Sequence, residues 1–232
     1  MIAVLTPTRG KPDLALRMLE SAKDTADEPD RVRMLFGIDH DETEDYSVLN
    51  KQGLCVRMGE AENTVGKVWN FLVGLAPDAA QLMMGNDDLV YCTQGWDTAL
   101  KERVQKYQDG IYVAWFDDGS PASSYRCAFP IVSMKWCTTL GYFMPICFNF
   151  LWHDTWVWHI GRELGRELYI PDVLVEHRHF SFQKAEYDAT YRRHRIGREA
   201  RDKRKADEVL FGEMEEVRHR HAMQLKAVMH NV

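Results

Sequence analysis

The stretch Gln81-Leu82-Met83-Met84-Gly85-Asn86-Asp87-Asp88 is the one from which the fold is best predicted. Its first four residues form a short apolar run that predicts a buried strand, and Gly85 allows the backbone to turn where that strand ends. The polar triplet 86–88 would then lie at the carboxyl end of a strand, where open α/β sheets place their ligands. Adjacent carboxylates suit Mg²⁺ or Mn²⁺, although a turn or a helix cap would also explain them.

Short apolar runs alternate with helical patterns on both sides of this stretch. We predict further strands at residues 2–6 (closed by Pro7), 32–38, 55–56, 111–116 and, as a final pair, 168–175, and helices over residues 11–22, 66–75 and 152–164. This alternation favours an α/β fold with a mostly parallel central sheet flanked by helices. From about residue 187 the chain becomes charged and helical. We therefore expect a main domain over residues 1–182 and a basic, amphipathic helical C-terminal extension over residues 183–232.

Composition excludes several classes of protein. The net charge of −6 gives no general attraction to nucleic acid or to anionic membranes, so such a partner would need a local patch. The five cysteines are scattered without a C-x-x-C pair, which argues against a disulfide framework and a structural zinc site. We expect neither a signal peptide nor a membrane span, because the N-terminus runs directly into a strand and no apolar run is long enough. The sequence thus predicts a cytoplasmic protein.

The loop after the first strand differs from the common phosphate-binding loops. The chain has no G-x-G-x-x-G after that strand and no G-x-x-x-x-G-K-[ST]. The strand ends instead in Thr6-Pro7-Thr8-Arg9-Gly10, whose hydroxyls and guanidinium could hold a phosphate or simply stabilise a turn. After the second strand, Asp39 could accept a hydrogen bond from a base or a ribose, or remain a solvated acid.

Two groups in the second half of the chain carry ionisable side chains. Asp154 begins a predicted helix among aromatic residues, so it could be a general base or a helix cap. The segment Glu176-His177-Arg178-His179 closes a strand, and strand alternation places its two histidines on one face. Two such histidines are candidate metal ligands, although single histidines are usually structural.

In this order, these motifs resemble GT-A-fold, nucleotide-sugar-dependent glycosyltransferases of the compact inverting type found in bacteria and bacteriophages. The similar elements are the Thr6 to Gly10 loop, the strand-end Asp39, a D-x-D-like triplet at residues 86–88, Gly95-Trp96, Asp154-Thr155-Trp156 and the strand-end histidine of residues 176–179. The resemblance covers about residues 1–191 and implies a GT-A, Rossmann-like fold.

The resemblance also implies roles for individual residues. A nucleotide-diphosphate sugar, with uridine as the expected nucleoside, would be held by the donor-binding residues Thr6, Pro7, Thr8, Arg9, Asp39, Lys67, Asn86 and Asp87. Asp88 and His177 would bind Mn²⁺ or Mg²⁺, with His179 as the second choice of histidine ligand. Asp154 would remove the proton of the acceptor hydroxyl. The aromatic loop 142–152 could form a stacking floor for a sugar or base, or belong to the core.

One departure from the pattern concerns the metal. The first position of the triplet is Asn86, whose amide adds no charge, so Asp88 would carry most of the metal binding. His153 stands where an acid often precedes the catalytic Asp, and it either orients Asp154 or packs. Two other functions remain open. A nucleotidyltransferase would share the sheet and the metal but should have a glycine-rich first loop, and a non-catalytic nucleotide-sugar-binding module would tolerate a decayed site.

The C-terminal extension suggests the acceptor and an interface. Residues 187–205 contain eight Arg or Lys against three acids in an otherwise acidic chain. This basic stretch could be a solvated helix face, or it could follow the phosphate backbone of DNA whose hydroxymethylated base accepts the sugar. Beyond it, apolar residues recur every three or four positions from Leu210 to Val228, which predicts an amphipathic helix that packs on the body or forms a homodimer.

Overall fold

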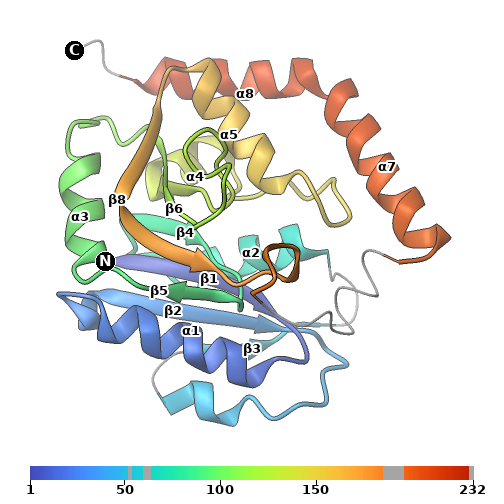
Figure 1. Cartoon of the computed structure of the whole chain (residues 1–232). Helices are drawn as coiled ribbons and strands as arrows, with labels where there is room; N and C mark the ends of the chain where they lie inside the picture. Colours follow the sequence, from blue (N-terminus) through green and yellow to red (C-terminus); the bar gives the residue numbers. More distant parts are fainter. Residues whose placement is uncertain (52–53, 60–63, 185–195, 230–232) are drawn as a thin grey trace.

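The strands that the apolar runs predict assemble into one sheet in the computed structural model, which describes residues 1–51, 54–59, 64–184 and 196–229. In this part of the chain the sheet has eight strands in the order β3-β2-β1-β4-β7-β6-β8-β5 (Figure 1). Their bounds are β1 Ile2–Thr8, β2 Val32–Ile38, β3 Leu54–Arg57, β4 Gln81–Met84, β5 Leu89–Tyr91, β6 Val113–Asp117, β7 Ile131–Ser133 and β8 Glu167–His177. Only β7 and β5 run antiparallel to their neighbours, so the sheet is mostly parallel as expected.

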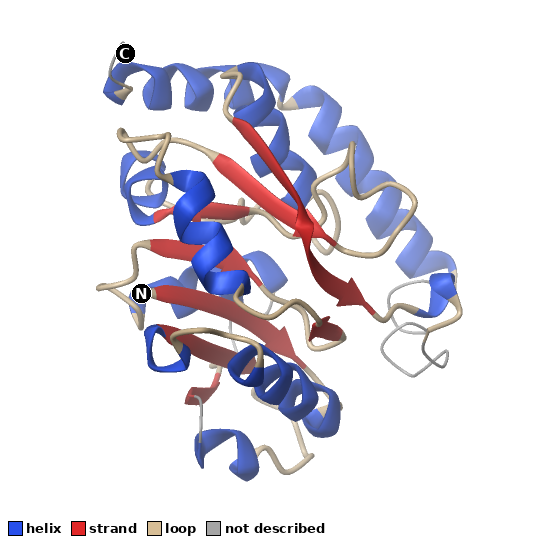
Figure 2. Ribbon diagram, turned by 60° about the vertical axis from the view of Figure 1, so that its left-hand side comes forward, coloured by secondary structure: helices blue, strands red, loops and turns tan. Residues whose placement is uncertain are grey.

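Helices cover both faces of this sheet (Figure 2). They are α1 Pro12–Asp24, α2 Val65–Gly74, α3 Trp96–Val104, α4 Met134–Leu140, α5 His153–Glu163, α7 Arg198–Glu213 and α8 Glu215–Val228, with short 3₁₀ turns η1 Pro29–Arg31, η2 Ser47–Lys51 and η3 Phe180–Phe182. Helices α1 and α3 bury their apolar faces on one side of the sheet, and α2, α4, α5 and α8 do so on the other.

Two strands differ from their predicted limits. Strand β1 continues through Pro7 to Thr8 because β4 pairs with it only as far as Leu5. The Leu5 carbonyl faces β4, so alternation turns Pro7, which lacks an N–H, toward a side with no paired strand. The predicted strand pair over 168–175 is a single strand, β8, which pairs with β6 in its first part and with β5 in its last.

The C-terminal helices share the core of the main body. Phe211, Ala222 and Leu225 are buried in the same apolar cluster as α2 and α5. Helix α8 contacts α4 and α5, and its residues Val217 and Val228 pack against this cluster, as does Met214 between α7 and α8. The prediction of one amphipathic helix from Leu210 to Val228 is wrong in one respect, because α7 ends at Glu213 and α8 begins at Glu215. Of the two predicted partners, it is the body of the same chain on which this segment packs. No described helix is long and apolar enough to cross a membrane.

Candidate functional site

The polar ends of β1, β2 and β4 lie at one edge of the sheet, because these strands run parallel to one another. The Gly85 N–H donates to the Leu5 carbonyl at 2.8 Å, which brings the end of β4 against β1. A Cβ at Gly85 would lie only 2.2 Å from Thr6 Oγ1, so a larger residue would push the two strands apart. The glycine of the sequence motif thus places residues 86–88 beside the loop that follows β1.

Thr8 and Asp87 form the centre of a buried network at this edge. Thr8 Oγ1 donates to Asp87 Oδ2 at 2.8 Å, and it lies 3.2 Å from the Tyr46 hydroxyl. That hydroxyl accepts from the Lys11 N–H at 2.9 Å, and the Lys11 ammonium lies 4.0 Å from Asp87 Oδ1. Burial raises the pKa of Tyr46 to about 12, so this phenol stays protonated. Asp87 therefore ties the β1 loop to the β4 loop.

Arg9 and Asp39, two of the predicted donor-binding residues, contact each other. The Arg9 guanidinium forms ion pairs with Asp39 and with Asp41, which raise the pKa of Arg9. The same guanidinium holds the pKa of Asp41 well below its usual range. Arg57 donates to three backbone carbonyls between residues 39 and 42, so the loop after β2 is held in a defined shape.

Asp88 and His177 are brought together by strand pairing. Strand β5 pairs antiparallel with β8 with Leu89 opposite His177, so Asp88, just before β5, lies beside the end of β8. Asp88 Oδ2 is 3.2 Å from His177 Nε2, Asp88 is 2% exposed, and the His177 side chain is largely buried. The ring of His177 packs edge-on against Phe129, with ring centroids 4.9 Å apart. A carboxylate and an imidazole thus face each other at the predicted metal position.

The donor atoms at this position fit part of a metal site. His177 Nε2 is buried and, apart from its 3.2 Å approach to Asp88 Oδ2, has no hydrogen-bond partner within the described ranges, which suits a nitrogen that would bind a cation. His179 lies nearby, with its ring centroid 5.0 Å from that of His177, and its Nδ1 accepts from the Ser181 N–H. Among the described residues no group of three or more His, Cys, Asp or Glu could hold a metal by itself. Oxygens of a ligand would have to complete the coordination of an ion here.

Asp154 occupies the first turn of α5. Its side chain is half-buried and accepts a hydrogen bond from Thr155 Oγ1 at 3.3 Å. The helix cap that the sequence suggested for Asp154 is wrong, because the N-cap residue of α5 is Trp152. Burial raises the pKa of Asp154, which is opposed in part by the positive charge of Arg126. A carboxylate with a raised pKa has the greater proton affinity that a general base needs.

His153 packs in the core. Its ring is 2% exposed and lies edge-on to Trp69 and Phe148, at centroid distances of 5.5 and 5.7 Å. Burial lowers its pKa to about 4, so the ring is neutral. Of the two roles considered for this residue, packing is the one that these contacts support.

Lys67 and Asn86 are the other two predicted donor-binding residues. A Cβ at Gly66 in α2 would lie 2.8 Å from His153 Nε2, so the first turn of α2, which carries Lys67, abuts the start of α5. Asn86 is half-buried and its carbonyl accepts from the Leu89 N–H. In the aromatic loop 142–152, Phe143 and Phe148 lie in the core and are at most 1% exposed, whereas Ile146 is 56% exposed and Trp152 is only partly buried.

Sequence reasoning missed several charged side chains near these residues. Arg17 on α1 lies close enough to Asp87 and Asp88 for their charges to affect its pKa, which burial lowers. Arg126 lies close enough to Asp154 for its positive charge to oppose the rise in the pKa of Asp154. Neither stands in a motif, so only the packing of α1 and of the loop before β7 reveals them. For Arg17, the usable signal in the sequence is the helical pattern of apolar and charged positions along α1.

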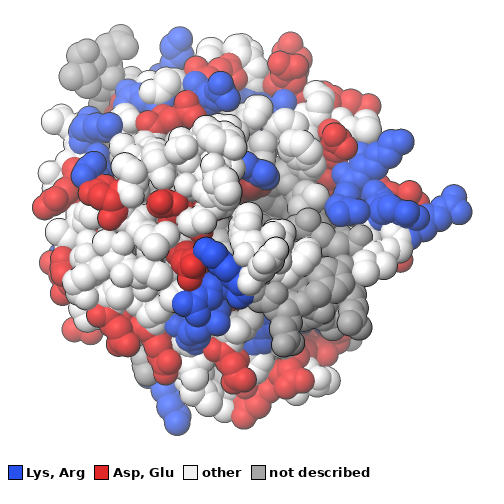
Figure 3. Space-filling view, in the orientation of Figure 1, with Lys and Arg blue, Asp and Glu red and all other residues white. Residues whose placement is uncertain are grey.

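The predicted basic stretch is partly outside the described residues, which omit Arg192, Arg193 and Arg195. Its described part begins at residue 196 and continues in α7, and Figure 3 shows Lys and Arg side chains gathered on this helix. Two of its cations pair within the helix, Arg198 with Asp202 and Lys203 with Glu199. Exposed pairs of this kind add little to stability.

Comparison with known proteins identifies the fold. No protein-family profile and no curated protein sequence matches the chain. The crystal structure of S. aureus TarS aligns with a TM-score of 0.60 and 11% identity over 75% of this chain and 36% of that chain. Residues 1–349 of TarS in complex with UDP-GlcNAc align equally well, over 57% of that chain. A mannosyltransferase, PcManGT from Pyrobaculum calidifontis in complex with GDP-Man and Mn²⁺, aligns with a TM-score of 0.59 and 14% identity over 77% of this chain and 57% of that chain.

The predicted Rossmann-like α/β fold is therefore confirmed, and it is shared with proteins that bind nucleotide sugars. This chain spans between 36% and 59% of the length of the TarS chains that it matches. At these identities the likeness concerns the fold, and function must be argued from the site.

Proposed function

We propose that this protein is an inverting glycosyltransferase that moves a sugar from a nucleotide diphosphate to an acceptor hydroxyl. The observation that carries the proposal is the buried pair of Asp88 and His177 at the ligand-binding edge of the sheet. The fold comparison supports it, because neighbours with this fold are in complex with UDP-GlcNAc and with GDP-Man and Mn²⁺.

The donor would lie across the carboxyl ends of β1, β2 and β4. In this proposal Asp39 and the loop of Thr6, Pro7, Thr8 and Arg9 hold the nucleoside, which we take to be uridine, while Lys67 and Asn86 approach the ribose or the diphosphate. Arg9 already contacts Asp39 and Asp41, so its part is to fix the shape of the nucleoside pocket. Asp87 acts on the donor through Thr8, to which it is hydrogen-bonded.

Asp88 and His177 would hold Mn²⁺ or Mg²⁺, which supplies positive charge to the diphosphate when bound. Asp154 takes the proton of the acceptor hydroxyl, whose oxygen forms the new bond to the anomeric carbon. The bond from that carbon to the diphosphate breaks, and its electron pair leaves with the nucleoside diphosphate. Because the pKa of Asp154 is raised, the reaction should slow on acidification at a higher pH than an exposed carboxylate would give.

The proposal extends to the acceptor and the setting. We propose a hydroxymethylated base in DNA as the acceptor, a bacteriophage origin, and action in the cytoplasm. The basic stretch that runs into α7 supports a polyanionic acceptor. A homodimer through α8 stays a prediction, and it would have to use another face of this helix, because the apolar face packs on its own chain.

A second function has one observation in its favour. Asp87 accepts a hydrogen bond from Thr8, and residue 86 is an asparagine whose amide carries no charge. The predicted metal position therefore offers one carboxylate, that of Asp88, and one imidazole, that of His177. A site with so few ligands could bind a nucleotide sugar without turning it over. A nucleotidyltransferase has no comparable support.

Calorimetry with UDP-GlcNAc and GDP-mannose, with and without Mn²⁺, tests donor binding. We expect micromolar to millimolar affinity that requires Mn²⁺, and we expect Asp88→Ala to weaken it at least tenfold. Asp202→Ala on α7 serves as the control, because this exposed acid lies in the C-terminal helix and not at the predicted donor position. Equal affinity of wild type and Asp88→Ala for the donor in the presence of Mn²⁺, or a wild-type affinity that a chelator leaves unchanged, would refute the assigned metal position.

A further inference from the structure

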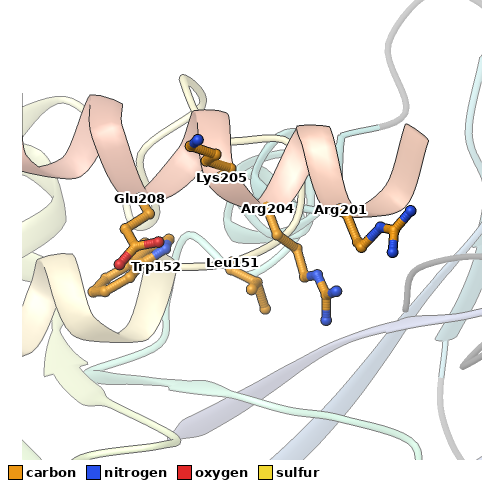
Figure 4. Close-up of a pocket in the computed structure, with 6 residues that line it drawn as sticks. All are labelled: Leu151, Trp152, Arg201, Arg204, Lys205 and Glu208. Atoms are coloured by element: carbon orange, nitrogen blue, oxygen red, sulfur yellow. The ribbon is translucent and has the colours of Figure 1, made fainter. Parts of the chain in front are cut away.

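A groove of about 450 Å³ lies between α7 and the loop that leads into α5. It is lined by Leu151, Trp152, Arg201, Arg204, Lys205 and Glu208 (Figure 4). Three of these side chains are cations and one is an acid, so the lining carries a surplus of two positive charges. None of its residues is among those assigned to donor binding, to the metal or to the general base.

Arg201 and Arg204 share one side of α7, because residues at positions i and i+3 of a helix are neighbours on its surface. Lys205 extends from another side of the helix in Figure 4. Figure 4 shows Arg201 and Arg204 extending from the side of the helix that faces Leu151. Arginine binds phosphate oxygens with two donors at once, so this lining suits a ligand with more than one phosphate.

The aromatic wall of the groove is held in an unusual backbone conformation. Trp152 has φ 75°, in the left-handed region that non-glycine residues rarely adopt. The conformation is stabilised from α7, where the buried Asp207 accepts from the N–H groups of Asn149, Phe150 and Leu151. The indole of Trp152 stacks on Phe211 with ring centroids 4.6 Å apart. Strain of this kind is concentrated at functional sites, and here it turns an aromatic ring toward a basic groove.

The position of Trp152 links this groove to the chemistry. It is the capping residue of α5, and Asp154 stands two residues later in the first turn. Residues two apart on a helix do not face each other, so the groove and the candidate base share the start of α5 without a contact between the two side chains. A positive groove with an aromatic side chain is the usual site for single-stranded nucleic acid, because every base offers a face for stacking.

We propose that this groove binds the acceptor strand of DNA, with phosphates on Arg201 and Arg204 and an unpaired base on Trp152. The catalytic part of this inference rests on the proposed glycosyltransferase function. The binding part does not, since it needs neither donor nor metal.

Fluorescence anisotropy with a labelled ten-nucleotide oligothymidine, titrated with the full chain between low and physiological salt, tests the binding. The double variant Arg201→Ala/Arg204→Ala should weaken binding at least tenfold and lower the salt slope by about 1.4, since each phosphate contact on a single strand contributes about 0.7. The matched control is Arg198→Ala/Lys203→Ala, which removes two charges from the same helix at residues that do not line the groove. We expect this control to change affinity less than threefold.

The aromatic contact is tested with Trp152→Phe and Trp152→Ala. Trp152→Phe should bind nearly as well as wild type, whereas Trp152→Ala should lose roughly fivefold or more, because a stacked base contributes about 1–3 kcal/mol. Thermal unfolding of both variants checks that α5 remains folded. If Trp152→Ala is unfolded, the comparison of the two double arginine variants decides the matter.

Three results would overturn the inference: no binding of the oligonucleotide by wild type at low salt, equal losses in the two double variants, or equal affinity for inorganic polyphosphate of the same charge. The last would show a general polyanion site. Oligonucleotide binding through the groove by a protein that binds no nucleotide sugar would support this inference and contradict the proposed function.

Discussion

At the scale of single residues, neighbours in sequence have opposite roles in this protein. His153 and Asp154 both lie in the first turn of α5, yet the imidazole is enclosed by Trp69 and Phe148 while the carboxylate is only half-buried. Burial disfavours the charged form of each, lowering the pKa of His153 and raising that of Asp154. The lowered pKa of His153 affects stability, and the raised pKa of Asp154 suits a general base.

His153 should make the protein less stable in mild acid. Its pKa is about 4 in the folded state and 6.5 when the ring is fully solvated, so the unfolded chain binds the proton first as the pH falls. The free energy of unfolding should therefore decrease between pH 6.5 and about 4, by roughly 3 kcal/mol in total. His153→Phe should lose this part of the pH dependence, as measured by urea unfolding at pH 7 and pH 5. The same pH dependence in wild type and variant would contradict the assignment.

At the scale of elements, the sequence predicts strands better than it predicts the contacts between them. Strands β2 and β4 have the bounds expected from their apolar runs, and the acids at their ends lie at one edge of the sheet. The three-residue β7 was missed because it is embedded in an aromatic-rich region without a period of its own. The approach of Asp88 to His177 depends on the pairing of β5 with β8, which no local pattern reveals.

Contacts made by the backbone are equally hidden in the sequence. Asp207 stands in a charged helix and resembles a solvated acid, but it is 1% exposed and accepts from three successive backbone N–H groups and from Asn149 Nδ2. Backbone donors carry no side-chain signature. For this reason the attachment of α7 to the start of α5, and with it the groove at Trp152, could be recognised only in the structure.

Asp207→Ala should be strongly destabilising, because it would leave three partly buried N–H groups of residues 149–151 without their acceptor. We expect a loss of roughly 3–5 kcal/mol in the free energy of unfolding, with a smaller loss for Asp207→Asn, which keeps one acceptor oxygen. Urea unfolding measures both, with Asp202→Ala on the exposed side of the same helix as the control, expected within about 0.5 kcal/mol of wild type. A loss below about 1 kcal/mol for Asp207→Ala would show that this carboxylate does not hold the loop.

At the scale of the whole molecule, the C-terminal helices complete the core on one face of the sheet. Phe211, Ala222 and Leu225 are at most 9% exposed within the cluster that contains α2 and α5. The predicted division into a main domain over residues 1–182 and an extension over residues 183–232 rests on composition. Buried contacts join the two parts, because side chains of α7 and α8 pack with those of α2 and α5. The extension thus belongs to the packing unit that carries Asp154.

A truncated chain that ends at residue 182 tests this dependence. Without α7 and α8, Trp152 and Trp156 lose the side chains that cover them, so we expect the shortened protein to aggregate or to unfold at least about 10 °C below the full chain. Circular dichroism during heating measures the difference. A truncated protein with the melting temperature of the full chain would show that residues 1–182 form an independent domain.

The central claim, sugar transfer with Asp154 as the base, is tested most directly by the release of nucleoside diphosphate. The assay uses UDP- and GDP-sugars with Mn²⁺ and an oligonucleotide that carries a hydroxymethylated pyrimidine. Wild type should release nucleoside diphosphate and form a product of inverted anomeric configuration. Asp154→Asn should reduce the rate about 10²–10⁴-fold with donor affinity within threefold of wild type. No release from any donor, a retained configuration, or an undiminished rate in Asp154→Asn would contradict this mechanism.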